Sequence, residues 1–200
     1  MTTRDVRQHF DKSFFDRFYH SKTTAVVTRD DIRRLAKFVV SYLDYLRVPV
    51  DTVLDVGCGL GMWRGALRRL RPKVGYTGLD TSEYLCDRYG WIRSSIIDYR
   101  SRSKFDLVIC QDMMQYIDDD QAIRSIEAIA ALCRGAFYLD VLTKEDVARG
   151  ALDLRRTDRD VHIRSAKWYL RAVTPHFERA GGGVFIPKSS RTTLLSLERG

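Results

Sequence analysis

The sequence has 200 residues, 44% of them hydrophobic, with a formal net charge of +8, which fits one folded domain and excludes a disordered chain. No stretch approaches the roughly 18 consecutive apolar residues of a membrane helix. The N-terminal residues mix charges with aromatics and lack the apolar core of a signal peptide, so we expect a cytoplasmic protein.

Residues 1–50 predict a helical segment. Thr28 and Asp31 form a capping-box-like helix start. Apolar residues then recur at helical spacing until Pro49 ends the helix; they are Ile32, Leu35, Ala36, Val39, Val40, Leu43 and Leu46. A shorter helix rich in aromatic residues is expected before it, between residues 10 and 19. We predict that this segment forms a cover packed on the main domain.

From residue 51 onward, strand and helix signals alternate. The predicted strands span residues 52–56, 74–79, 92–97, 105–110 and 136–142. The predicted helices span residues 62–71, 82–89 and 119–133, with one or two helical turns within 165–177. Residues 183–187 and 192–197 are expected to form a closing antiparallel hairpin. This alternation predicts an α/β domain over residues 51–200, with a parallel sheet and helices on both faces.

A glycine loop follows the first predicted strand, in the sequence Val-Leu-Asp-Val-Gly-Cys-Gly-Leu-Gly-Met (53–62). Glycines allow positive φ and let a ligand approach the backbone at a helix N-terminus. The GxGxxG fingerprint of dinucleotide-binding proteins would need a glycine at Met62, and the Gly-Lys-Ser/Thr of a Walker A loop is absent. Asp55 would repel a pyrophosphate but would tolerate a ligand with an ammonium and a sulfonium. The loop therefore favours S-adenosylmethionine (SAM) over NAD.

Two further acidic residues end predicted strands. Asp80 ends the second, where its carboxylate could accept hydrogen bonds from a ribose diol. Asp98 closes the third, where it could accept from an adenine amino group. Ligands of open α/β sheets bind at the carboxyl ends of the strands, so the glycine loop and both acids are expected at one edge.

Four segments resemble the class I SAM-dependent methyltransferase family, and the resemblance covers residues 50–200. They are Val-Leu-Asp-Val-Gly-Cys-Gly-Leu-Gly (53–61), Tyr-Thr-Gly-Leu-Asp (76–80), Ser-Ile-Ile-Asp (95–98) and Phe-Asp-Leu-Val-Ile-Cys (105–110). The resemblance implies a Rossmann-like seven-stranded sheet of order 3-2-1-4-5-7-6 with strand 7 antiparallel. It also implies these cofactor contacts: Asp55, Gly57, Gly59 and Gly61 on the methionine and ribose side, Asp80 at the ribose hydroxyls, Asp98 and Tyr99 at the adenine, and Gln111 and Asp112 near the sulfonium.

The predicted reaction is an in-line displacement, in which positioning supplies much of the rate and a base takes the proton of a hydroxyl or protonated amine. His162 is the leading candidate for the base because histidine titrates near neutral pH. Asp112 and Tyr116, after the fourth predicted strand, are the other catalytic candidates. The candidates for substrate binding are Arg164, Trp168, Tyr19 and His20.

We expect no metal site. The cysteines Cys58, Cys86, Cys110 and Cys133 form no CxxC pair and have no histidine at metal-ligand spacing. The acidic run 118–120 fits the N-terminal turn of a helix, where carboxylates interact favourably with the helix dipole.

The acceptor is open between three hypotheses. Methyltransferases of base amines in this family carry Asn/Asp-Pro-Pro-Tyr/Phe after strand four, whereas this sequence has Gln-Asp-Met-Met-Gln-Tyr (111–116). The difference argues against exocyclic base amines and favours a small-molecule acceptor. The net charge of +8 supports an RNA or protein methyltransferase instead. A SAM-binding regulatory subunit without activity of its own is the third hypothesis, because fold does not establish function.

Overall fold

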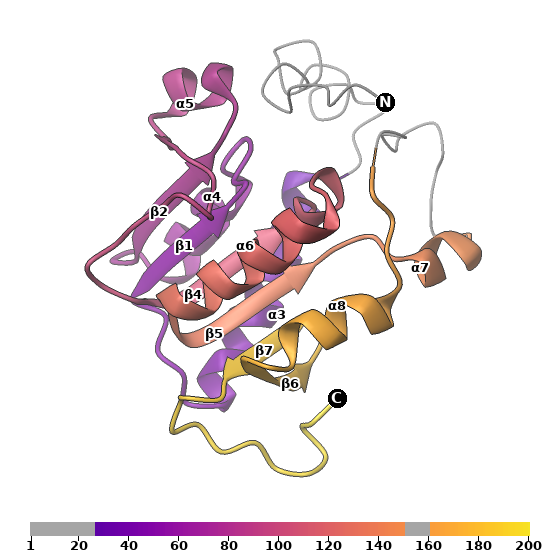
Figure 1. Cartoon of the computed structure of the whole chain (residues 1–200). Helices are drawn as coiled ribbons and strands as arrows, with labels where there is room; N and C mark the ends of the chain where they lie inside the picture. Colours follow the sequence, from indigo (N-terminus) through magenta and orange to yellow (C-terminus); the bar gives the residue numbers. More distant parts are fainter. Residues whose placement is uncertain (1–26, 151–160) are drawn as a thin grey trace.

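The computed structural model describes residues 27–150 and 161–200, which form a sheet with helices on both faces (Figure 1). The strands are β1 (Thr52–Val56), β2 (Gly75–Asp80), β3 (Ile92–Arg93), β4 (Phe105–Gln111), β5 (Cys133–Asp140), β6 (Phe177–Gly181) and β7 (Val184–Pro187). Their order across the seven-stranded sheet is β3-β2-β1-β4-β5-β7-β6. Strands β1 to β5 pair in parallel, and β7 runs antiparallel to β5 and β6. The predicted order and the antiparallel seventh strand are confirmed.

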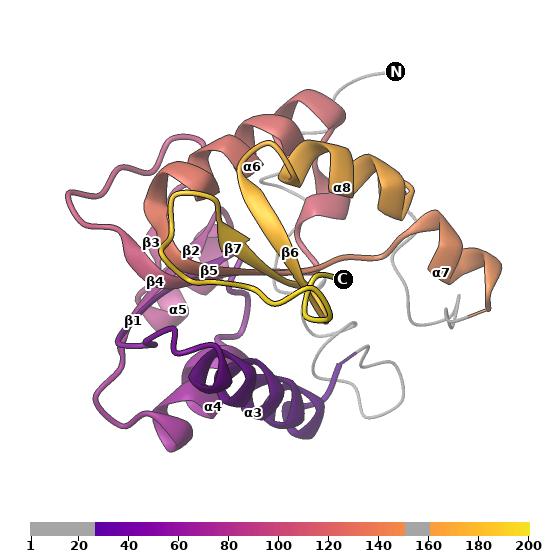
Figure 2. The same ribbon diagram turned by 90° about the horizontal axis from the view of Figure 1, so that it is seen from below.

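Helices α3 (Arg29–Tyr45) and α4 (Met62–Leu70) lie side by side on one face of the sheet (Figure 2). A capping box begins α3 as predicted, since the Thr28 side chain accepts from the Asp31 backbone and the Asp31 side chain from the Thr28 backbone. The apolar side of α3 shares one core with Trp63 of α4 and with β1, β4 and β5. The described part of the predicted cover is therefore a layer of the main domain. The aromatic helix expected between residues 10 and 19 lies outside the described residues.

Helices α6 (Asp119–Leu132) and α8 (Ala166–Val173) cover the opposite face (Figure 2). Helix α5 (Glu83–Tyr89) lies beside β2 and β3, and α7 (Lys144–Ala148) follows β5. Asp118 caps α6 in a capping box with Gln121, and the next two acidic residues occupy the first turn, as predicted for the acidic run. No helix within the described residues is long and apolar enough to cross a membrane.

The third strand is shorter than predicted. Strand β3 contains only Ile92 and Arg93, which pair with the end of β2, whereas the sequence predicts a strand to residue 97. The Ser95 hydroxyl donates to the Asp98 carboxylate and accepts from the Asp98 backbone, and the Tyr99 N–H bonds to the Ser95 carbonyl. These local bonds form a turn in place of a ladder with β2.

The closing hairpin uses a different partner strand from the predicted one. Strand β7 pairs with β6 (Phe177–Gly181) and not with residues 192–197, which form no strand. Gly181, Gly182 and Gly183 all have positive φ and make the tight turn between β6 and β7. The helical turns expected within 165–177 form α8, which ends at Val173. The pairing prediction was wrong because residues 177–181, to which no strand was assigned, form β6.

Candidate active site

The glycine loop lies where β1 ends and α4 begins. Gly57, Gly59 and Gly61 have φ of 69°, 52° and 66°, so each uses the left-handed conformation that favours glycine. The backbone N–H groups of Gly57 and Cys58 both donate to the Leu79 carbonyl of β2. Among the described residues, a Cβ on Gly59 would meet only the Gly57 carbonyl oxygen, at 4.0 Å. At Gly59 the loop therefore presents backbone near the N-terminus of α4 that the described residues leave uncovered, where a ligand can approach closely.

Asp80 ties the end of β2 to this loop. Its Oδ2 accepts from the Gly59 N–H at 2.9 Å, and its Oδ1 accepts from the Ser82 N–H at 2.9 Å. Burial raises the pKa of Asp80, while its backbone hydrogen bonds act in the opposite direction. A carboxylate oxygen has more than one lone pair, so both oxygens can still accept from a ligand. The structure thus places Asp80 directly against the glycine loop.

Trp91 packs against the glycine loop and bonds to it, a role that was not predicted from the sequence. Its indole Nε1 donates to the Gly59 carbonyl at 2.9 Å. Its ring lies so close to Gly61 and Gly78 that a Cβ on either would come within 3 Å of it. The guanidinium carbon of Arg64 lies 4.5 Å from the ring centroid. Gly78, inside a predicted strand, was the available sequence signal, because a glycine there marks close approach of another group.

Asp55 lies at the end of β1, where it is almost completely buried. The Tyr76 hydroxyl of β2 donates to its carboxylate. The pKa of Asp55 is raised to about 7, chiefly by burial; the hydrogen bond from Tyr76 opposes this shift and the nearby Asp80 adds to it. A cationic ligand beside Asp55 would favour the ionised carboxylate.

The carboxyl ends of β4 and β5 form the other half of the edge. The Gln111 side chain accepts from Trp63 Nε1 at 2.7 Å and donates to Asp140 Oδ2 at 3.2 Å. Asp112 follows with φ of 53°, and its N–H donates to the Asp140 carbonyl at 2.9 Å. Burial and, to a smaller extent, the neighbouring Asp140 together raise the pKa of Asp112 to about 6. The carboxylates of Asp112 and Asp140 therefore lie near each other at the carboxyl ends of β4 and β5.

The loop after β4 contacts the glycine loop. A Cβ on Gly57 would come 2.7 Å from Met113 Cγ, so the methionine side chain lies directly on that glycine. Tyr116 ends the short 3-10 helix η2 (Met114–Tyr116) and packs against the apolar cluster that contains Cys58 and Leu85. The structure thus brings Asp112 and Tyr116 to the same edge as the predicted cofactor residues.

Asp98 and Tyr99 lie in the turn that replaces the end of the predicted third strand. Asp98 is exposed and accepts from the Ser95 hydroxyl at 2.7 Å. Tyr99 is half-buried and packs against the core that includes Ile96 and Val108. Their contact with an adenine stays a prediction.

The segment that begins at residue 161 also contacts the loop after β4. The His162 N–H donates to the Gln115 carbonyl at 2.7 Å, while the His162 side chain is exposed. Arg164 is buried, and its guanidinium donates to the Asp119 carboxylate, the Met114 and Ile117 carbonyls and the Tyr169 hydroxyl. It also lies 4.7 Å from the Trp168 ring centroid.

These contacts favour a structural role for Arg164 over the predicted substrate contact, because they occupy its donors within the protein. Tyr19 and His20, the predicted substrate contacts of the N-terminal segment, lie outside the described residues.

Comparison with known proteins agrees with this geometry. A family model for a methyltransferase domain matches residues 27–183. A ubiquinone biosynthesis O-methyltransferase of Xanthomonas campestris pv. campestris (strain B100) is 34% identical over 125 residues, covering 53% of this chain and 51% of that protein. The corresponding protein of Xanthomonas oryzae pv. oryzae (strain PXO99A) is 33% identical over the same shares. The chain thus spans about half the length of these relatives.

Two solved structures show the same fold at low identity. The plantazolicin methyltransferase BpumL in complex with SAH matches with a TM-score of 0.66 and 16% identity, over 85% of this chain and 72% of that chain. The N-methyltransferase NodS from Bradyrhizobium japonicum WM9 in complex with S-adenosyl-L-homocysteine matches with a TM-score of 0.54 and 15% identity, over 79% and 88%. At this identity the likeness concerns the fold alone.

Proposed function

The chain belongs to the methyltransferase-domain family, and on that premise we propose that it transfers a methyl group from SAM to a small-molecule acceptor. The observation that carries the proposal is the loop between β1 and α4. Its three glycines hold positive φ, and the described residues leave Gly59 uncovered beside the buried carboxylate of Asp80. Open backbone at a helix N-terminus, with an acid at the next strand end, suits a nucleoside ligand.

The charges along the edge fit SAM in particular. Asp55, Asp80 and Asp112 bring three carboxylates to the ends of β1, β2 and β4. They would repel a pyrophosphate and attract the ammonium and sulfonium of SAM. When bound, SAM supplies a methyl group that is already activated by its positively charged sulfur.

The residues of the chain then position the acceptor. Gln111 and Asp112 come from the end of β4, and Asp140 from the end of β5, next to the expected sulfonium position. Holding the acceptor atom in line at this end supplies much of the rate. The base is expected among Asp112 and the exposed His162, whose backbone is anchored to Gln115.

The acidic edge favours a small-molecule acceptor over RNA. A nucleic acid would bring phosphates toward the carboxylates of Asp112 and Asp140, which would repel them.

The test is calorimetric titration of the purified protein with SAM and with S-adenosylhomocysteine. Saturable binding of both is expected, and labelled-methyl transfer to candidate acceptors then follows. If a folded protein, verified by circular dichroism, binds neither ligand, the proposed function is wrong. Binding without transfer to any acceptor class would favour the regulatory-subunit hypothesis.

A further inference from the structure

Two adjacent carboxylates at the ends of β4 and β5 have no cationic counterpart among the described residues. Asp112 and Asp140 are joined through the backbone, and the Asp140 carboxylate is held by neutral groups, the Gln111 amide and the Tyr138 hydroxyl. No ion pair between described residues includes either acid. The charge of Asp146 in α7 also raises the pKa of Asp140, so a further acid acts on the pair. The pair is thus a partly buried concentration of acidic groups.

A buried amide beside the pair has an unused acceptor. Gln115 is only 6% exposed, and its Oε1 has no hydrogen-bond partner among the described residues. Its Nε2 lies 3.5 Å from Asp112 Oδ1, so the same amide group lies against the pair. A buried acceptor left without a donor costs free energy. A ligand that carries N–H donors would supply the missing bond.

We propose that Asp112, Asp140 and Gln115 receive a protonated amine, so that the methyl acceptor is an amine and not a hydroxyl or a carboxylate. This inference rests on the proposed function, because it names the acceptor class of that same site. An ammonium offers three donors. Two carboxylates and one amide oxygen are acceptors of matching number and sign.

The electrostatics of the reaction favour an amine for the same reason. A hydroxyl acceptor develops negative charge as it loses its proton, and two nearby carboxylates oppose that charge. An amine nitrogen becomes positive as it forms its new bond, and the same carboxylates stabilise it. The site thus favours the transition state of N-methylation over that of O-methylation.

The proton and electron balance closes within the site. The ammonium first gives one proton to a carboxylate of the pair, which leaves the nitrogen lone pair available. That lone pair forms the N–C bond to the methyl group, and the S–C bond breaks with its electrons kept by sulfur. The product is a protonated, methylated amine together with neutral S-adenosylhomocysteine, and the carboxylate releases its proton to solvent.

The experiment uses the full chain saturated with S-adenosylhomocysteine. Three probes with one scaffold are titrated by ligand-detected NMR: benzylamine, benzyl alcohol and benzoate. A second series uses propylamine, propanol and propanoate, so that the scaffold does not decide the outcome. We expect at least one amine to bind tenfold or more tightly than its alcohol and carboxylate counterparts. Equal binding, or preference for an alcohol or a carboxylate in both series, overturns the inference.

Substitutions locate the effect. Asp140→Asn should abolish the amine preference while leaving the affinity for S-adenosylhomocysteine unchanged. Asp51→Asn is the matched control, because Asp51 is an exposed acid just before β1, at the opposite edge of the sheet. It should keep the preference. If Asp140→Asn keeps the preference and folds normally, Asp140 does not receive the amine.

The two failures are distinguishable. If the unsubstituted protein does not bind S-adenosylhomocysteine, the proposed function is contradicted. Intact binding without amine preference contradicts only the acceptor class.

Discussion

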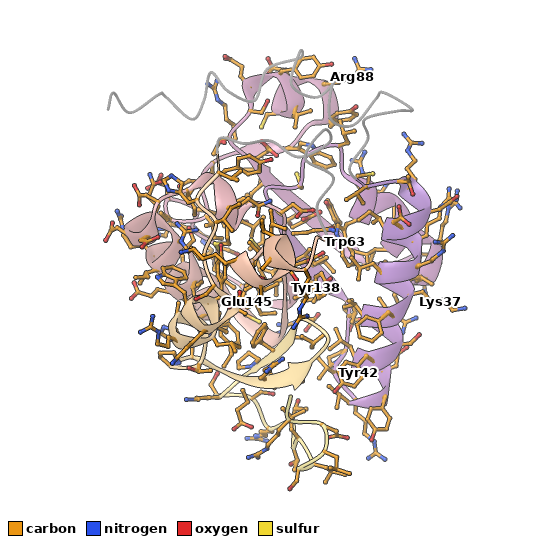
Figure 3. The ribbon with its side chains drawn as sticks, turned by 90° about the vertical axis from the view of Figure 1, so that its right-hand side faces the viewer. Lys37, Tyr42, Trp63, Arg88, Tyr138 and Glu145 are labelled. Carbon is orange, nitrogen blue, oxygen red and sulfur yellow. The ribbon has the colours of Figure 1, made fainter. Side chains whose placement is uncertain are left out.

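The indole Nε1 of Trp63 donates to the side-chain oxygen of Gln111 at 2.7 Å, which links the first turn of α4 to the end of β4. Trp63 is buried beneath α3, and its ring centroid lies 5.5 Å from that of Tyr138 (Figure 3). Gln111 continues the chain of contacts to Asp140. The helical layer therefore helps to position a carboxylate of the proposed acceptor site.

Trp63→Phe removes the donor and, because a phenyl ring is smaller than an indole, also leaves a small cavity. The Gln111 oxygen then lacks its partner, which should lower the free energy of unfolding by about 1–3 kcal/mol. Urea denaturation measures this change. Tyr45→Phe is the control, because it also removes one donor but from an exposed pair with Glu198, and it should change stability by less than about 0.5 kcal/mol. A change for Trp63→Phe as small as that expected for the control would contradict the prediction.

Gly61→Ala tests the loop against its tryptophan support. Gly61 has φ of 66°, and a Cβ there would lie 2.4 Å from the Trp91 ring. Left-handed strain and overpacking together predict a loss of about 2–4 kcal/mol of stability. Gly65→Ala is the matched control. Gly65 lies on the exposed side of α4, and a Cβ there meets no described residue within 4 Å. That change should stabilise the helix by up to about 1 kcal/mol. Thermal unfolding of both variants gives the comparison.

Asp80→Ala should weaken SAM binding by about 1–3 kcal/mol, because the carboxylate of the predicted ribose contact is lost together with its bond to the Gly59 N–H. Calorimetric titration measures the affinity. Asp87→Ala removes an exposed acid from neighbouring helix α5 and should leave the affinity unchanged. An unchanged affinity for Asp80→Ala would show that the ribose contact is assigned to the wrong residue.

Arg164→Met should destabilise the fold by about 2–4 kcal/mol, because the Met114 and Ile117 carbonyls lose their charged donor. Arg124→Met is the control, since Arg124 forms an exposed pair with Asp120 at 3.9 Å, which contributes at most about 1 kcal/mol. Chemical denaturation separates the two. A stable Arg164→Met protein with a raised acceptor KM would instead support the substrate-binding prediction.

The sequence predicted those parts of the site that depend on neighbouring residues. The loop glycines and Asp80 could be identified because each motif lies within one strand–loop–helix unit. Trp91 was missed because its contacts with Gly61 and Gly78 join segments that only the folded chain brings together. The burial of Arg164 could not be predicted from the sequence, because it depends on carbonyls about fifty residues earlier in the chain.

Asp55 predicts a specific pH dependence of stability. Burial raises the pKa of its carboxyl from an ordinary value of 3.8 to about 7. The folded state therefore holds a proton that the unfolded state has already released between these two values. The stabilisation from that proton is complete below the unfolded pKa and is lost as pH rises through about 7, with a limiting slope of about 1.4 kcal/mol per pH unit.

The measurement is the free energy of unfolding from pH 5 to pH 8.5 for the unsubstituted protein and for Asp55→Asn. The substitution keeps an acceptor for the Tyr76 hydroxyl and removes the titration, so the variant should lose less stability as pH rises. Saturating SAM should reduce the difference, because its positive charges favour the ionised carboxylate. SAM affinity of the unsubstituted protein should therefore rise with pH through 7, and that of Asp55→Asn should change less. Parallel stability curves would mean that Asp55 is already ionised in the folded protein.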